Sequence, residues 1–348
     1  MENVAQFYSA QQRLFVTAML SSGALILLGA LLSLGFGPAG WDWQLAIAWL
    51  HPSSFEQFTN LQINIVTEIR LPRFCLAMLV GLVLAQTGTA TQALCRNPLA
   101  DPSIIGVTAG AAVAAVMMIG VGYQYNIDVA FWLPIASFIG ALSVTALVAM
   151  LSTRGGAINV TNLILVGVAL NALAFAVIGL VSFYADDSAL RLINYWTMGS
   201  LAGATWSTLF NALPLMLISI VGLYSLNKKL NVLLLGESEA KYLGLDVSKL
   251  KHKTVIFTAI GVGATVSMTG MIGFIGLIVP HISRMIVGPK ITYVMPLSMA
   301  IGAAGLLLAD WAARNVVSPA ELPIGIITAL IGAPFFLYLL IQQRSKHA

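Results

Sequence analysis

The sequence predicts an all-α, polytopic membrane protein with about ten transmembrane helices. Hydrophobic residues make up 59% of the chain and charged residues only 9%, whereas soluble domains carry about 25% charged residues. Several runs without Asp, Glu, Lys or Arg are long enough to cross a bilayer, which takes about 20 residues per helix. Lys and Arg gather between alternate runs, as they do in cytoplasmic loops. We therefore expect residues 1–348 to form a single transmembrane domain.

The spans follow from the charge-free runs. In chain order these runs are 14–41, 74–95, 103–127, 129–153, 155–185, 192–227, 254–283, 291–309 and 322–343. We interpret the first run as a retained span, because no small-residue cleavage site follows it.

The run 254–283 decides the span count. Three lysines at 249–253 precede it, and Arg284 and Lys290 follow it. A single crossing would place these two basic groups on opposite sides of the membrane. Two crossings place both inside and leave each helix roughly 22 Å long at 1.5 Å per residue, with Gly270 and Gly273 available for the reversal. We therefore expect two crossings here, ten in all, and both termini in the cytoplasm.

With this topology, all but four of the 17 Lys and Arg residues are cytoplasmic. The exceptions are Arg70, Arg73, Arg191 and Arg314. The seven Trp residues fall near the outer face, as an interfacial belt would. Two independent signals therefore agree on the orientation.

Arginines on the outer side allow two interpretations. Arg70 and Arg73 open the second span, and Arg314 ends the ninth. They could pair within the chain, with Glu68, Asp310 or Glu321, or extend to lipid headgroups. Alternatively, they could form a docking surface for an acidic patch on an external partner.

A rigid polar turn separates the second and third spans. Residues 96–102 read Arg-Asn-Pro-Leu-Ala-Asp-Pro, and the two prolines forbid a continuous helix. Such a turn can be a plain connector or part of a gate.

Residues 228–253 form the only sizeable inner loop. Within it, 237–243 can make a short helix that Gly244 ends and Ser238 could cap. Ala240 and Leu243 would share a small apolar face, and Glu237 and Lys241 are four residues apart on one face. This helix either lies on the headgroups or inserts into a groove of a cytoplasmic partner.

Other functions find little support in the sequence. No Gly-x-x-x-x-Gly-Lys-Ser/Thr motif is present, so we do not expect this chain to bind ATP in a P-loop. The histidines lack metal-ligand spacing, and ionisable residues deep in the spans are nearly missing. A membrane enzyme is therefore disfavoured, and a self-contained secondary transporter or channel remains an alternative.

Six ordered blocks resemble the permease subunits of bacterial type II ABC importers, the group that carries iron-siderophore complexes, heme and cobalamin. The blocks are Arg-Leu-Pro-Arg at 70–73, 92–102, Tyr-Trp-Thr-Met-Gly-Ser-Leu at 195–201, 235–244, 273–284 and 321–336. Together they cover roughly residues 65–342.

The resemblance implies a transport subunit rather than an enzyme. It implies a second permease subunit, identical or related, two cytoplasmic ATPases that use ATP and Mg, and a periplasmic substrate-binding protein, all at the bacterial inner membrane. It implies no cofactor, metal or nucleic acid bound by this chain. The expected cargo is an iron(III)-siderophore complex moved into the cytoplasm by alternating access, with heme or cobalamin as alternatives.

The resemblance also assigns roles to residues. It places binding-protein docking at Arg70, Arg73 and Arg314, and a short outer helix within 186–201. We expect a central passage at the subunit interface, lined by spans five, eight and ten. The remaining assignments are a cytoplasmic gate of Asn97, Pro98, Leu99, Val160 and Thr161, and ATPase coupling through Gly236, Glu237, Ala240, Leu243 and Gly244.

Overall fold

The chain folds into a bundle of long helices. The computed structural model describes residues 2–37, 40–41, 58–125 and 127–345. The expected outer loop 42–68 lies partly outside them. The elements are α1 (Glu2–Gly35), β1 (Phe36–Gly37), β2 (Gly40–Trp41), α3 (Asn60–Asn64), the π-helical turn η2 (Ile65–Arg70), α4 (Leu71–Cys95), the 3-10 turn η3 (Pro102–Ile105), α5 (Val107–Tyr125), α6 (Val129–Ser152), β3 (Thr153–Arg154), β4 (Ala157–Ile158), α7 (Val160–Tyr184), α8 (Asp187–Met198), α9 (Trp206–Leu233), α10 (Glu237–Tyr242), α11 (Val247–Thr269), α12 (Ile275–Val287), α13 (Ile291–Asn315) and α14 (Ile324–Ser345). β1 pairs with β2 and β3 with β4, both antiparallel.

The span count agrees with the predicted ten crossings. Among the described residues, seven helices are long and apolar enough to cross a membrane: α1, the continuous run from α3 to α4, α5, α6, α7, α9 and α13. The shorter apolar helices α12 and α14, together with the 23-residue α11, complete the set. The short helix expected within 186–201 is α8, and the run 192–227 therefore contributes only one span, α9.

The two crossings within 254–283 differ from the prediction of equal halves. α11 begins at Val247, before the expected start, and its 23 residues span about 35 Å. The chain then reverses through 270–274, and α12 has only 13 residues, or about 20 Å. The predicted lysine cluster at 249–253 is therefore part of α11 rather than of a loop.

Helix α4 is the centre of the bundle. It packs against α9, α11, α12 and α13, and most of its apolar stretch is buried, whereas α1 and α7 are largely exposed. A Cβ atom at Gly88 would overlap the backbone carbonyl of Gly276 on α12. This close approach needs glycine, because small residues let helix backbones come close together in membranes.

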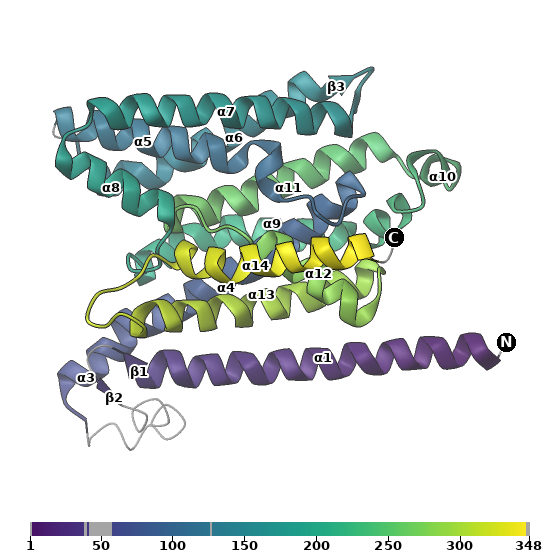
Figure 1. Cartoon of the computed structure of the whole chain (residues 1–348), viewed down its shortest axis with the longest axis horizontal. Coiled ribbons are helices and arrows are strands. Elements are labelled where there is room, and N and C mark those ends of the chain that lie inside the picture. Colours follow the sequence, from purple (N-terminus) through teal and green to yellow (C-terminus); the bar gives the residue numbers. More distant parts are fainter. Residues whose placement is uncertain (1, 38–39, 42–57, 126, 346–348) are drawn as a thin grey trace.

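The ends of the helices define two faces (Figure 1). The start of α1, the end of α14, the β3–β4 hairpin and α10 lie at one end of the bundle, and α3 and α8 lie at the other. An even number of crossings produces this arrangement. Most Lys and Arg residues fall at the α10 end, which is therefore the end that the positive-inside rule predicts to be cytoplasmic.

Candidate functional site

Buried ion pairs occupy the outer ends of α4 and α13. Asp310 is 1% exposed. Its carboxylate accepts from Arg73 Nε at 3.0 Å and lies 2.9 Å from Arg73 Nη2. Arg314 Nε lies 3.1 Å from the other oxygen of Asp310, and Arg73 Nη1 donates to Glu321 at 2.9 Å. We call these four residues the outer cluster.

Two further contacts connect the arginines of this face to α1. Arg70 is buried, and its Nη1 donates to the Leu34 carbonyl at 2.6 Å. Arg314 Nη2 donates to Ser33 Oγ at 2.8 Å. The guanidinium groups of Arg70, Arg73 and Arg314 therefore lie inside the protein, which is the intrachain alternative that the sequence left open. The predicted docking role of Arg70, Arg73 and Arg314 stays a prediction.

The turn between α4 and α5 forms as the sequence predicts. Arg96 ends α4 in the left-handed region, at φ 48°, and the Asn97 side chain accepts from the Leu99 backbone N–H at 2.9 Å. Asp101 caps the following 3-10 turn by accepting from Ser103. Asn97 and Pro98 are exposed at the α10 end, where a gate would lie.

The start of α7 borders the same region. Asn159 caps α7 by accepting from the Asn162 backbone N–H at 3.0 Å. A cavity of about 360 Å³ is lined by nine residues from the turn, the β3–β4 hairpin, α7, α10 and α11: Arg96, Arg154, Ala157, Ile158, Asn159, Val160, Thr161, Glu237 and Lys251. Two expected gate residues, Val160 and Thr161, thus line the same cavity as Arg96, the first residue of the turn. Asn97, Pro98 and Leu99 do not line this cavity.

Helix α10 is short and presents an exposed tip. Gly236 is its N-cap residue, so Ser238 is not the cap that the sequence suggested. Gly244 follows with φ 81°, and its N–H donates to the Lys241 carbonyl at 2.9 Å, which confirms the predicted stop. Tyr242 is 92% exposed and Leu243 67% exposed.

One prediction about α10 is wrong. Ala240 is fully buried and belongs to the core between α9, α11 and α13, so it shares no exposed apolar face with Leu243. Glu237 forms its ion pair with Lys251 at 2.7 Å rather than with Lys241. The exposed apolar surface of α10 therefore consists of Tyr242 and Leu243, and Ala240 anchors the helix to the bundle.

Asp246 caps the following helix, α11. Its carboxylate accepts from the Lys249 backbone N–H at 2.9 Å. That hydrogen bond lowers the pKa of Asp246 below the ordinary value of an aspartate. The carboxylate therefore stays ionised when the pH falls to the ordinary pKa of an aspartate. The capping carboxylate of Asp246 is therefore ionised at neutral pH.

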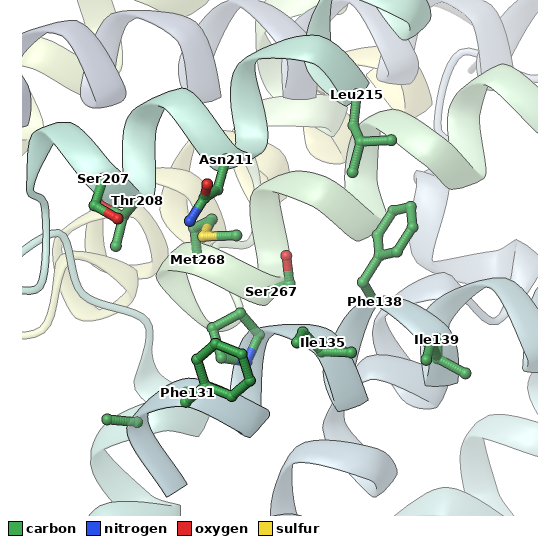
Figure 2. A pocket seen from close by; sticks show the side chains of 12 residues that line it. Phe131, Ile135, Phe138, Ile139, Ser207, Thr208, Asn211, Leu215, Ser267 and Met268 are labelled. Atoms are coloured by element: carbon green, nitrogen blue, oxygen red, sulfur yellow. The ribbon is translucent and has the colours of Figure 1, made fainter. Parts of the chain in front are cut away.

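A second cavity, of about 430 Å³, lies between α6, α9 and α11 (Figure 2). Ser207, Thr208 and Asn211 of α9 face Phe131 of α6 across it, and Met268 of α11 lies between them. None of its lining residues is charged. A third cavity, of about 340 Å³, lies between α12, α13 and α14 and also has no charged lining. Neither is lined by His, Cys, Asp or Glu.

These features together define a class of protein: a polytopic helical membrane bundle whose described residues include a short helix, α10, exposed at its basic end. Comparisons with known proteins identify the family. The profile of the FecCD transport family matches residues 25–342, and the chain belongs to this family. It is a permease subunit of an ABC importer.

Relatives of known transport function match along nearly the whole chain. The hemin transport system permease protein HmuU of Yersinia pestis is 40% identical, over 96% of this chain and 98% of that protein. The vitamin B12 import system permease protein BtuC of Vibrio cholerae is 38% identical, over 86% and 88%. A solved metal-chelate type ABC transporter in an inward-facing conformation has a TM-score of 0.82 and 34% identity, over 93% of this chain and 98% of that one.

Proposed function

We propose that this chain pairs with a second permease subunit, identical or related, and works with two cytoplasmic ATPases and a periplasmic binding protein. The exposed tip of α10 carries the proposal. A tyrosine and a leucine that are 92% and 67% exposed beyond the basic end of a membrane bundle lack an apolar environment of their own. A groove on an ATPase would bury them, and the chain itself has no P-loop.

The proposed cargo is heme, carried as an iron chelate. HmuU, whose printed name specifies hemin, aligns over 98% of its length. The iron(III)-siderophore complex expected from the sequence remains the second candidate, because the similar solved structure is of the metal-chelate type. Cobalamin is the third, through BtuC.

The proposed passage lies where α7, α12 and α14 would meet the second permease subunit. Helix α7 is largely exposed although it is strongly apolar, and α14 exposes Leu330 and Ile331. The described part of α14 up to Ile341, like the whole of α7, has no charged residue. A weakly binding wall suits a large chelate, because tight polar contacts would hold the cargo in place.

The proposed transport cycle is alternating access. The inner gate comprises the turn at Asn97, Pro98 and Leu99 and the start of α7 at Val160 and Thr161. ATP-driven closure of the ATPases would displace α10, and the gate elements around the 360 Å³ cavity would follow.

Docking of the binding protein is proposed at the opposite end, near the outer cluster. Glu321 is the most accessible member of that cluster, with a side chain 31% exposed. An acidic lobe of the partner would reach Arg73 by replacing Glu321, whereas Arg70 and Arg314 would support the site from inside.

Reconstitution tests the proposed function. The permease is purified with its ATPase, placed in proteoliposomes, and supplied with binding protein loaded with radiolabelled heme, ferric siderophore or cobalamin. We expect ATP-dependent uptake of heme. Uptake without the ATPase would reject the importer assignment, and uptake of only one of the other two chelates would reject the cargo.

A further inference from the structure

Lys251 is an unusual side chain in this protein. It is 2% exposed and is the largest of the fully buried side chains among the described residues. It lies on α11, one turn after the start of that helix. Burial of an ammonium group is costly unless hydrogen bonds and an opposite charge compensate it, so its partners must lie close by.

Both partners of Lys251 come from elements at the cytoplasmic end. Its Nζ donates to Glu237 Oε1 at 2.7 Å and to the Ile158 backbone carbonyl at 2.8 Å. Glu237 is the first residue of α10. Ile158 ends β4, two residues before Val160 opens α7. One ammonium group therefore joins α10, α11 and the chain that leads into α7.

A neighbouring contact reinforces the connection to the hairpin. Ser248 Oγ, also on α11, donates to the Gly156 carbonyl at 2.6 Å in the β3–β4 turn. The hairpin is thus attached to α11 at two positions, the carbonyls of Gly156 and Ile158. Around these contacts, Arg96 and Arg154 line the same cavity as Lys251 and Glu237. Glu237 is the one acidic residue that lines this cavity, beside three basic residues.

We propose that Lys251 is a positioning residue that makes α10 and the start of α7 move as one unit. If α10 moved without α11, the buried ammonium of Lys251 would lose its acidic partner, Glu237. The β3–β4 hairpin must move together with α10 and α11 as well, because the same ammonium group donates to the Ile158 carbonyl. Motion at the exposed tip of α10 is thereby passed to Val160 and Thr161. This inference rests on the proposed function, in which an ATPase moves α10.

The first test replaces Lys251 with methionine, which keeps the length of the side chain and removes the charge and all donors. Transport is measured as cargo moved per ATP hydrolysed in proteoliposomes that contain the ATPase and binding protein. We expect this ratio to fall at least about tenfold. Lys251→Arg keeps a charged donor and should recover part of the ratio.

A matched control lies on the same turn of α11. Lys249 is 79% exposed and pairs with Asp246 at 3.1 Å, so Lys249→Met removes one lysine and one ion pair without touching the buried contacts. This variant should keep the wild-type ratio. A ratio for Lys251→Met equal to that of Lys249→Met would overturn the proposal.

A distance measurement separates coupling from a general structural role. Spin labels at Tyr242→Cys and Thr161→Cys, in a chain whose native cysteines are replaced, report the separation of the α10 tip from the start of α7. With Lys251 intact we expect one narrow distance distribution with and without ATP, and with Lys251→Met a broad one. Narrow distributions in both proteins would contradict the proposal.

The outcomes remain distinguishable from failure of the proposed function. If the unmodified chain shows no ATP-driven uptake, the proposed function fails. If it transports and Lys251→Met transports with the same ratio, only the role of Lys251 fails. If Lys251→Met does not assemble with the ATPase, the transport ratio of a second variant, Glu237→Gln, tests the role of Lys251 instead. This second variant keeps an acceptor for Lys251 but removes the charge, so a lowered ratio supports the role and a wild-type ratio rejects it.

Discussion

Asp310 is the residue whose loss should destabilise the isolated chain most clearly. Its carboxylate, 1% exposed, faces two buried guanidinium groups, those of Arg73 at 2.9 Å and Arg314 at 3.1 Å. Asp310→Asn preserves the size of the side chain and removes its charge. Arg314 then keeps Ser33 as a hydrogen-bond partner but loses its adjacent buried carboxylate.

The expected loss of unfolding free energy in Asp310→Asn follows from the geometry of the ion pairs. Removing one partner of a buried ion pair costs about 3–5 kcal/mol, because the other charge stays buried and uncompensated. Glu321 continues to neutralise Arg73 at 2.9 Å, which favours the lower end, about 3 kcal/mol. At 1.4 kcal/mol per factor of ten, the ratio of folded to unfolded protein should fall about a hundredfold.

Unfolding of the purified chain in mixed micelles, by stepwise addition of a denaturing detergent, gives the free energy of unfolding. Lys249→Met is the control, since that lysine belongs to an exposed pair and exposed pairs contribute little. If Asp310→Asn and Lys249→Met unfold at the same detergent fraction, the buried-pair interpretation of the outer cluster is refuted.

Three further predictions concern other parts of the chain. Leu243→Asp should abolish cargo-dependent stimulation of the ATPase, because a charge in an apolar groove costs several kcal/mol unless it is paired; normal stimulation would argue against α10 as the contact. Gly88→Val should destabilise the bundle by at least about 1–3 kcal/mol through overpacking against α12, whereas Gly305→Ala, at a position with open space around the added atom, should change the unfolding free energy little. Glu321→Gln should tighten the binding protein's Kd about two- to fivefold, because a carboxylate that competes for Arg73 is removed and rim charges contribute up to about 1 kcal/mol; weaker binding would contradict docking near the outer cluster.

Much of the fold could be predicted from local signals. The charge-free runs, the positive-inside bias and the turn residues at 96–102 and Gly244 each act over a few residues, and the structure confirms the spans and the turns. The uneven lengths of α11 and α12 could not be predicted in the same way. The lysines at 249–253 suggested a loop, yet they belong to α11, which Asp246 caps ahead of them and in which Lys251 has buried partners.

In the candidate site, too, some features could be predicted from the sequence and others could not. Asp310 and Glu321 were identified as alternative partners for the outer arginines, but sequence distance alone could not decide between pairing and exposure. Ala240 and Leu243 are three residues apart, which suggested a shared face, but α10 is too short to carry a face independent of the bundle.

The burial of Lys251 was indicated by a sequence pattern that we did not use. Val247, Leu250, Lys251 and Thr254 follow the 3.6-residue period of a buried helix stripe, and all four are buried. A lysine on such a stripe needs a partner, and the acidic residue at 237 was available.

The orientation of α10 tests the account most directly. A single cysteine at Tyr242, in a chain whose native cysteines are replaced, is treated with a membrane-impermeant maleimide in right-side-out and in inverted membrane vesicles. We predict labelling only in the inverted vesicles, and protection from labelling when the ATPase is bound. Labelling only from the outer side would contradict both the topology and the proposed ATPase contact.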